Sequence, residues 1–226
     1  MSASRSSSSP STSTSTSSPS PSPSPSTSTS TSAPELSRTQ QRTRTALLRA
    51  GIEVLSGDPS APLGEVAERA GVARSTLRRY FSDKKALTAA ITAFVGAEHD
   101  EALRRANLAE GTGLEAVRRF ALELMDRLDV LAWIMGGGLM LDDTADLHDP
   151  TWAAPEQAVL DAAARGLADG SIDPSMSPVW VESLLWSVLY SAHHAPAAAE
   201  ITTTEARSQA LRSLVKALAT DSTSVP

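Results

Sequence analysis

The sequence predicts an all-α fold for the part of the chain that follows residue 36. Apolar side chains recur three and four positions apart in one segment after another, which is the spacing of one face of a helix. No segment alternates apolar and polar residues for long enough, with enough β-branched or aromatic side chains, to predict a strand. The chain also has no internal repeat of the solenoid type. Helices joined by loops are therefore the expected architecture.

The first 34 residues have a composition of their own. They contain 18 Ser, 6 Thr and 6 Pro, so almost no apolar side chain can offset the entropy of ordering this backbone. We expect a disordered tail over residues 1–36 and a short disordered end over residues 221–226. The whole chain is 41% hydrophobic and 20% charged, and the remaining residues are enough for a sizeable core.

Composition and charge exclude several classes of protein. Because the chain has no cysteine, disulfide frameworks and thiolate metal sites are excluded. No apolar run of about 18 residues predicts a membrane span, and the N-terminus lacks the apolar stretch of a secretory signal, so we expect a cytoplasmic protein. The net charge of −6 is unevenly distributed, with +5 over residues 36–95 and −11 over residues 96–226. This asymmetry indicates that only the first segment meets a polyanion.

Spacing and helix-breaking residues predict four helices in the basic segment. In chain order they cover about 38–55, 62–70, 74–81 and a longer stretch that begins near residue 83. Gly71 separates the second helix from the third. The fourth helix begins at Ser82 or Asp83, either of which has a side-chain oxygen that can cap it.

The acidic segment is expected to contain four more helices. They cover about 114–131, 155–168, 178–195 and 203–219. In the first of them, apolar residues stand at positions 114, 117, 121, 124, 128 and 131, a pattern that predicts one continuous amphipathic helix. Three glycines at 136–138 and an acidic loop over about 142–150 follow this helix.

The stretch from Val66 to Leu87 has the features of a helix-turn-helix, in which two short helices cross steeply around a tight turn. Gly71 stands where the turn needs a positive φ, which only glycine adopts without strain. Ala67 is small enough for the second helix to cross close to it. Four apolar residues have the spacing to fill the wedge between the two helices: Val66, Val72, Leu77 and Tyr80.

The second helix of this motif keeps a polar and basic face. It is formed by Arg74, Ser75, Thr76, Arg78 and Arg79. A recognition helix in the major groove of DNA contacts base edges and phosphates through such side chains, and Arg is the commonest reader of guanine. The alternative is a short helical hairpin with a solvated basic face. We favour DNA binding because the turn chemistry and the basic face occur together.

The motif and the residues Tyr80-Phe81-Ser82-Asp83-Lys84 after it resemble the N-terminal domain of the TetR (tetracycline repressor) family of bacterial transcriptional regulators. The resemblance covers about residues 38–94. It implies a homodimeric repressor with a DNA-binding domain over 37–82 and a helical ligand-binding and dimerisation domain over 83–220. By position, it implies DNA contacts from Arg74, Ser75, Thr76, Arg78, Arg79, Tyr80 and Lys84. Lys84 would be the phosphate-binding lysine of the family, and Phe81 would belong to the core.

Three positions depart from the pattern of the family. Position 78, often Tyr, is Arg here, so the operator sequence cannot be taken from relatives. Ala73 stands where a Ser or Thr often caps the recognition helix. Ala61 stands where a cap of the second helix is usual, although Ser60 would serve if the helix began earlier. A missing cap costs about 1 kcal/mol of stability.

The resemblance also implies that the helices at 178–195 and 203–219 pack against their symmetry mates in a homodimer. Both have wide apolar faces, which favour a symmetric partner, and a buried pair within one chain is the alternative. The ligand pocket is expected among the helices at 114–131, 155–168 and 178–195, with an apolar or aromatic ligand. Its candidate lining residues are Met125, Trp133, Met135, Met140, Trp152, Trp186 and Tyr190.

No catalytic group, metal site or cofactor is expected. His193 and His194 are adjacent on a helix, so they do not easily face one metal ion. The acidic loop contains Asp142, Asp143, Asp146, His148 and Asp149. These residues could hold a divalent cation through oxygen ligands, but a solvated loop is preferred because they follow no recognisable ligand spacing. The chain has no G-x-S-x-G elbow and no phosphate-cradling glycine loop, so an enzyme is not expected.

The sequence thus leads to one preferred hypothesis and two alternatives. The preferred one is a ligand-responsive bacterial repressor, associated with the nucleoid, that binds a palindromic operator in double-stranded DNA and leaves it when a small-molecule inducer binds. The second is a DNA-binding regulator, repressor or activator, that is independent of ligands or controlled by a partner. The third is an all-helical enzyme with an incidental hairpin. A membrane partner is not expected.

Overall fold

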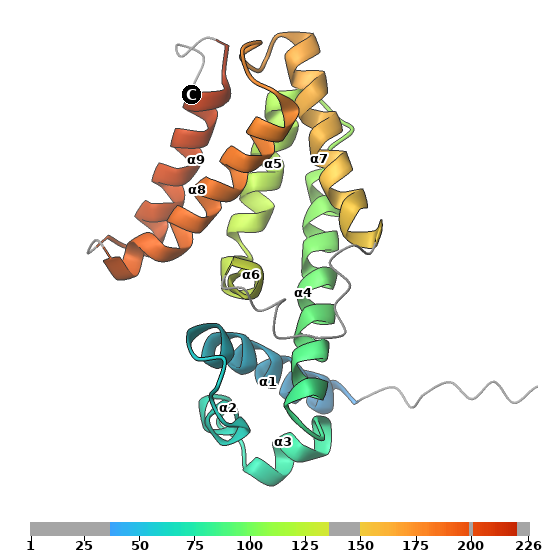
Figure 1. Ribbon diagram of the computed structural model, residues 1–226, viewed down its shortest axis with the longest axis vertical. Helices are drawn as coiled ribbons and strands as arrows, with labels where there is room; N and C mark the ends of the chain where they lie inside the picture. The colour runs from blue at the N-terminus through green and yellow to red at the C-terminus, as the bar shows by residue number, and fades with distance from the viewer. Residues whose placement is uncertain (1–36, 136–149, 199–200, 221–226) are drawn as a thin grey trace, which may run out of the picture. The chain divides into compact units, whose positions relative to one another are not determined.

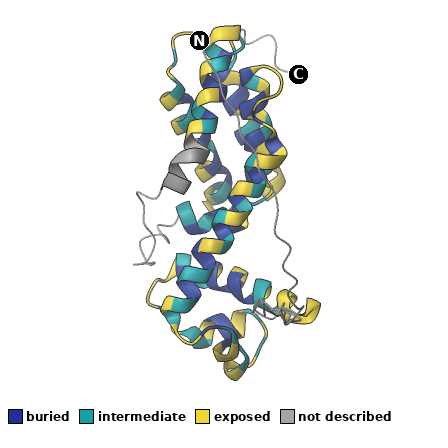
Figure 2. Cartoon of the chain, turned by 90° about the vertical axis from the view of Figure 1, so that its right-hand side faces the viewer, coloured by how far each residue is buried: buried dark blue, intermediate teal, exposed yellow. Residues whose placement is uncertain are grey.

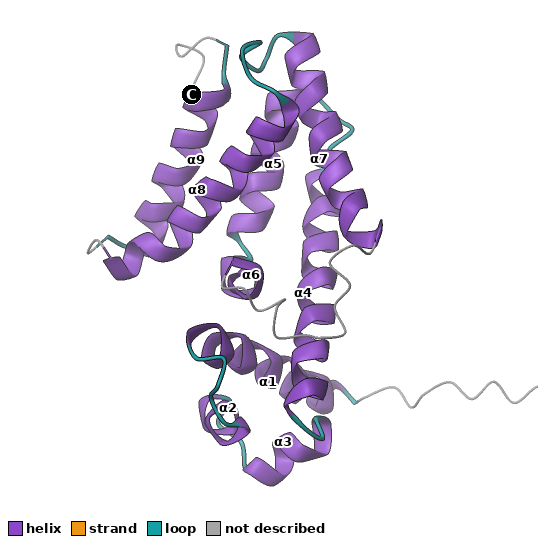
Figure 3. Cartoon of the chain, viewed as in Figure 1, coloured by secondary structure: helices purple, strands orange, loops and turns teal. Residues whose placement is uncertain are grey.

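The computed structural model describes residues 37–135, 150–198 and 201–220, with backbone only at 150–156. Across these ranges the regular structure is helical, apart from one isolated bridge between Ile172 and Ala219 (Figure 3). The predicted all-α fold is confirmed. The two expected disordered ends, the three glycines and most of the acidic loop lie outside the described residues.

The described helices are labelled in Figure 1. In chain order they are α1 (Arg38–Gly57), α2 (Leu63–Arg69), α3 (Arg74–Tyr80), α4 (Lys84–Ala106), α5 (Gly113–Met125), α6 (Leu128–Met135), α7 (Pro150–Asp169), α8 (Pro178–Ala198) and α9 (Thr203–Leu218). None of the helices in the described ranges is long and apolar enough to cross a membrane.

Helix α1 contacts both α2 and α4, and α2 in turn contacts α3. Ser37 starts α1 with a capping box, in which its hydroxyl accepts from the backbone N–H of Gln40 and the Gln40 side chain accepts from the N–H of Ser37. Leu47, Leu48 and Ile52 of α1 are almost completely buried. These apolar residues hold the short helices α2 and α3, which are too short to be stable alone.

Helix α4 connects this group to the remaining helices, because it contacts α1 as well as α5 and α6. Its first turn is capped by Asp83, whose carboxylate accepts from the N–H of Ala86 at 2.8 Å. Its last turn ends at Asn107, which adopts a positive φ of 45°. Buried side chains continue from α1 into α9, so one core extends through the described helices (Figure 2).

One expected helix is in fact two. The apolar pattern over 114–131 predicts a single helix, but α5 ends at Met125 and α6 begins at Leu128. At the break, the N–H of Arg127 bonds to the carbonyl of Leu124, a tighter turn than an α-helix makes. Leu124 and Leu128 are both buried, because each helix faces the same core. The apolar spacing therefore predicts the buried positions correctly and gives no sign of the break.

The other helix limits differ by a few residues from those expected. α7 begins at Pro150, five residues before the expected start near 155. α8 continues to Ala198 and includes Pro196 near its end. α8 packs on α9 and on α7, and α5 packs on α4, α7 and α9.

Candidate nucleic-acid interface and ligand pocket

The turn between α2 and α3 is built around Gly71, which has a φ of +68°. The N–H of Val72 bonds to the carbonyl of Ala67, and the N–H of Gly71 bonds to the carbonyl of Glu68, both at 3.0 Å. These two bonds form the glycine-ended helix terminus known as the Schellman motif. The positive φ expected for Gly71 is confirmed.

The wedge between the two short helices forms from the expected residues. Val66, Ala67 and Leu77 are at most 1% exposed, and Val72 and Tyr80 pack half-buried against the same core. Because α3 turns these side chains inward, its opposite face is left in solvent.

The exposed face of α3 is the basic face expected from the sequence. Arg74, Ser75, Arg78 and Arg79 are exposed, and Thr76 is half-buried. The guanidinium of Arg79 lies 5.7 Å from the centre of the Tyr80 ring, a cation–π distance. Helix α3 has three arginines and no acidic residue, so this face presents positive charge to solvent. We call the side chains of Arg74, Ser75, Thr76, Arg78 and Arg79 the α3 ridge.

Phe81 is 4% exposed and lies in the core directly after α3, as expected. The guanidinium of Arg44 on α1 lies 5.9 Å from the centre of its ring. Phe81 thus joins the end of α3 to α1.

Both caps that the sequence lacks are absent from the structure. Ala73 precedes α3 without a side-chain hydrogen bond, and Pro62 precedes α2 in the same way. Ser60 does not cap α2, because its N–H and hydroxyl both donate to the carboxylate of Asp58. These bonds from Ser60 lower the pKa of Asp58, aided by the charge of Lys84.

Lys84 lies at the start of α4 and fastens the loop between α1 and α2. Its ammonium group donates to the carbonyl of Ala61 at 3.0 Å and also to the carbonyl of Pro59. An ammonium has three donors, so one N–H is left for a phosphate oxygen. The structure therefore gives Lys84 a positioning role, and its contact with phosphate stays a prediction.

The side chain of Arg74 lies against Gly64 of α2, a contact that the sequence does not predict. A Cβ at Gly64 would lie 2.9 Å from the guanidinium of Arg74, so a larger residue there would shift the end of this exposed and flexible side chain. Nothing in the local spacing of α2 signals this contact, because it depends on the side-chain direction of another helix.

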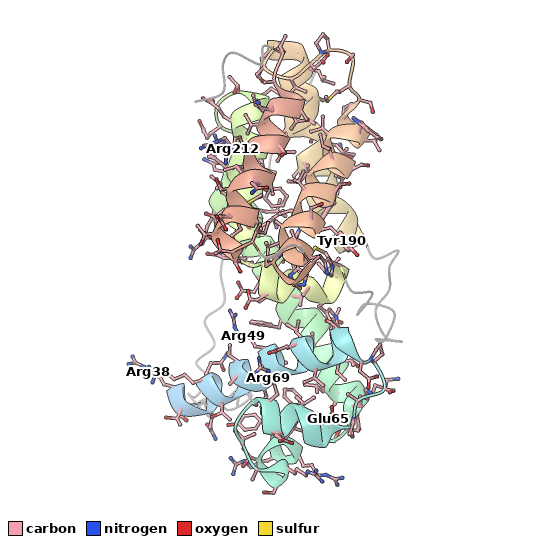
Figure 4. All side chains as sticks on the ribbon, turned by 90° about the vertical axis from the view of Figure 1, so that its left-hand side faces the viewer. Arg38, Arg49, Glu65, Arg69, Tyr190 and Arg212 are labelled. Atoms are coloured by element: carbon pink, nitrogen blue, oxygen red, sulfur yellow. The ribbon has the colours of Figure 1, made fainter. Side chains whose placement is uncertain are left out.

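Ion pairs connect the helices around the interface. Arg69 of α2 pairs with Glu53 of α1, and Arg49 of α1 pairs with Asp129 of α6. The second pair joins residues 80 positions apart and links α1 to the C-terminal helices. Figure 4 shows Arg49 on α1 and Arg69 below it. The sequence offers no signal for either pair.

The candidate pocket residues fall in different environments. Met125 and Trp133 are almost fully buried, and the indole N–H of Trp133 donates to the hydroxyl of Thr92 at 3.2 Å. Met135 and Trp186 are half-buried, whereas Tyr190 is 51% exposed on α8. Met140 and the side chain of Trp152 lie outside the described residues.

His99 of α4 belongs to the same buried cluster and was not predicted. It is 7% exposed, and its ring lies 5.7 Å from that of Phe120 and 6.2 Å from that of Trp186, nearly parallel to the latter. Burial lowers the pKa of His99, opposed by the charge of Asp100. Its spacing of four residues after Val95 could have placed it on the buried face of α4.

Comparison with known proteins agrees with this geometry. Residues 47–91 match the family described as bacterial regulatory proteins, tetR family. The HTH-type transcriptional repressor LfrR of Mycolicibacterium smegmatis is 28% identical over 163 residues, which cover 70% of this chain and 82% of LfrR. A crystal structure of the TetR-like regulator LfrR from Mycobacterium smegmatis in complex with proflavine has a TM-score of 0.57 and 25% identity. That match covers 79% of this chain and 97% of the LfrR chain.

A TetR family regulator from Marinobacter aquaeolei shares the fold, with a TM-score of 0.55 at 21% identity over 81% of this chain and 99% of that one. The motif, the fold and the relatives therefore agree. Residues 47–91 match the N-terminal domain of the tetR family of bacterial regulatory proteins, and the helix-turn-helix of this domain is formed by α2 and α3.

Proposed function

We propose that the chain is a DNA-binding transcriptional repressor that leaves its operator when a small apolar or aromatic ligand binds. The observation that carries the proposal is the α3 ridge, a basic and exposed helix face next to a glycine-ended turn. Its relative LfrR is named a transcriptional repressor, and one LfrR structure holds proflavine, a flat aromatic cation.

In this proposal α3 enters the major groove. The residues that contact DNA are Arg74, Ser75, Thr76, Arg78, Arg79, Tyr80 and Lys84. Arg78 and Arg79 are free to reach base edges because both are exposed. Lys84 holds the loop between α1 and α2 and directs its remaining N–H towards a phosphate.

The domain division proposed here assigns residues 37–82 to DNA binding and residues 83–220 to ligand binding and dimerisation. Three large apolar residues of α8 support a dimer through α8 and α9. Val179, Trp180 and Tyr190 are 61%, 60% and 51% exposed, although α8 and α9 pack against each other within the chain. Exposed apolar side chains grouped on one helix favour a partner surface, and a second copy presents the same surface. Such a dimer addresses the two halves of a palindromic operator.

The ligand is proposed to bind among α4, α5, α6 and α8, where Met125, Trp133, Met135 and Trp186 lie. His99 adds a neutral ring stacked on Trp186. Rings of this kind suit a flat aromatic ligand, which can stack on them. A ligand that displaces α6 would act on α1 through Arg49 and Asp129.

DNA binding is tested with genomic duplexes selected by the purified full chain. Arg78→Ala/Arg79→Ala should weaken binding to the selected duplex by about thirtyfold or more, because each base or phosphate contact of an arginine is worth at least about 1 kcal/mol. Arg104→Ala/Arg105→Ala is the matched control, since it removes two adjacent charges from α4 that pair with Glu101. Equal loss in both variants, or no loss in either, contradicts the assignment of the α3 ridge.

The ligand response is tested by thermal shift with a panel of aromatic compounds that includes proflavine. A true inducer should raise the melting temperature of the free protein and release it from the selected duplex. DNA binding that no stabilising compound affects would indicate the ligand-independent regulator instead.

A further inference from the structure

A cavity of about 430 Å³ lies where α1, α6 and α8 meet. It is lined by Arg49, Glu53 and Ser56 of α1, Asp129 of α6, and His193 and His194 of α8, among others. We call it the junction cavity. Its volume is in the range of sites for drug-sized molecules. It differs from the proposed ligand pocket, because none of the residues assigned to that pocket lines it.

More carboxylates than cationic side chains line the junction cavity. Arg49 is its lining cation, whereas Glu53 and Asp129 are both carboxylates. Arg49 uses one oxygen of Asp129, and Arg69, which lies outside the lining, uses one oxygen of Glu53. A carboxylate accepts several hydrogen bonds, so each has an oxygen to offer a further donor. The lining residues themselves carry more negative than positive charge, and the free oxygen on each carboxylate favours a cation over an anion.

The two histidines give the cavity an aromatic wall. Their rings lie 4.8 Å apart and nearly perpendicular, and the ring of Tyr190 lies 4.2 Å from that of His194. The tyrosine thus holds His194 in place. Burial and the neighbouring His194 lower the pKa of His193, with Asp129 opposing, so this imidazole is neutral at neutral pH and does not repel a cation. Aromatic rings beside carboxylates suit a flat organic cation.

Ser56, which lines the cavity, has a hydroxyl without a protein partner. This hydroxyl is buried and has no hydrogen-bond partner in the described part of the chain. A buried hydroxyl without a partner costs free energy, so a ligand that reaches it would gain a hydrogen bond.

We propose that the junction cavity is a second ligand site, specific for organic cations with a flat aromatic body. Asp129 and Glu53 are the counter-ions of the ligand, and His193 and His194 are the surface on which its body rests. Because Asp129 also binds Arg49, a ligand in this site competes with the contact that joins α1 to α6. The site is separate from the ligand pocket proposed above among α4, α5, α6 and α8, which we call the interior pocket. Its binding test does not require DNA.

The test uses histidine ring resonances of the full chain, which has four histidines. His193 and His194 report on the junction cavity, and His99 reports on the interior pocket, with each signal assigned by a single His→Gln variant. The probe is proflavine, a flat aromatic cation, and the matched probe is anthracene-2-sulfonate, a flat aromatic anion. We expect proflavine to shift the His193 and His194 signals in a saturable manner and the sulfonate to leave them unchanged.

Asp129→Asn removes the negative charge that the proposal requires. It should weaken the binding of proflavine, followed through the His193 and His194 signals, by about tenfold or more. This is the loss expected for a hydrogen bond to a charged group. Asp126→Asn is the control, because Asp126 stands three residues earlier, faces Arg207 at 3.8 Å and does not line the cavity. Glu53→Gln is the second test variant. It leaves the Arg49–Asp129 pair intact, so it remains informative if Asp129→Asn fails to fold.

Any one of three results would overturn the proposal. In the first, proflavine shifts His99 alone, which leaves only the interior pocket. In the second, the sulfonate shifts His193 and His194 as strongly as proflavine. In the third, both carboxylate variants bind proflavine like the wild type. If the proposed DNA-binding function is wrong, the result is different: the chain selects no duplex, but the histidine signals still respond to proflavine.

Discussion

Gly71 shows how much of the interface depends on one backbone conformation. Its φ of +68° lets α2 end and α3 begin with only four residues between them, so that the α3 ridge faces solvent. A Cβ at this position would meet no other atom within 4 Å. The requirement for glycine is therefore one of backbone strain and not of space.

Gly71→Ala should destabilise the fold by about 1–2 kcal/mol, the cost of a left-handed conformation for an L residue. Gly57→Ala is the matched control, because position 57 also has open space around it and lacks the positive φ. Chemical denaturation of both variants measures the free energy of unfolding. Equal free energies of unfolding for the two variants would show that a side chain at position 71 does not strain the turn.

The single-residue features differ in how far the sequence predicts them. The positive φ of Gly71 and the exposed arginines follow from local spacing, since helix geometry fixes which side chains share a face. The contact of Arg74 with Gly64 and the bonds of Lys84 to Pro59 and Ala61 do not, because they depend on how separate segments pack.

At the scale of helices, the N-termini of α3 and α4 differ in how they are capped. Asp83 caps α4 with a hydrogen bond of 2.8 Å, whereas Ala73 leaves the first N–H groups of α3 without a side-chain acceptor. The backbone of Ala73 has the extended conformation of an ordinary cap, with φ −66° and ψ 147°. A serine at this position therefore fits without any change of the chain.

Ala73→Ser should stabilise the protein by about 1 kcal/mol, the usual value of a helix cap. Ala93→Ser is the control, because residue 93 is exposed in the interior of α4, where serine is a poorer helix former than alanine. Thermal unfolding should show a higher midpoint for the first variant and a slightly lower one for the second. A shift of the same sign in both would contradict the cap explanation.

The break between α5 and α6 cannot be predicted from the spacing of the apolar residues. The guanidinium of Arg127 pairs with Glu123 at 2.9 Å and with Glu98 of α4 at 3.3 Å, although its side chain is only 11% exposed. The local pair with Glu123 and the tertiary pair with Glu98 hold the turn, and a pattern of apolar residues carries no information about either. The end of one helix and the start of the next share one buried face, so the periodicity continues across the break.

At the scale of the whole molecule, acid should destabilise the fold in two stages. Burial lowers the pKa of His99 below its ordinary value of 6.5, and burial with the neighbouring His194 lowers the pKa of His193, so protonation of either side chain favours the unfolded state. Hydrogen bonds lower the pKa of several carboxyls as well. These groups are Asp58, Asp83, Glu101, Glu115, Asp169, Asp173 and Glu205. Hydrogen bonds from Arg104 and Arg105 lower the pKa of Glu101 to about 2.

For every one of these groups the unfolded state binds more protons than the folded state, so stability falls as the pH falls. The first stage begins below about pH 6.5 and the second below about pH 4.5. His99→Phe keeps a ring between Phe120 and Trp186 and should reduce the first stage without changing the second. Denaturant titrations between pH 7.5 and 2.5 measure both. An unchanged slope between pH 7 and pH 5 would show that His99 is not the group responsible.

The claim on which the account depends is that the α3 ridge of two subunits reads two halves of one operator. Guanine N7 lies in the major groove and is one of the two acceptors that arginine binds, so its protection from methylation reports on this contact directly. On a duplex selected by the chain, we predict two blocks of protected guanines about one helical turn, or a multiple of one turn, apart. Arg78→Ala/Arg79→Ala should abolish both blocks. Tight binding of the wild type with no protected guanine, or protection that survives in the double variant, would contradict the account.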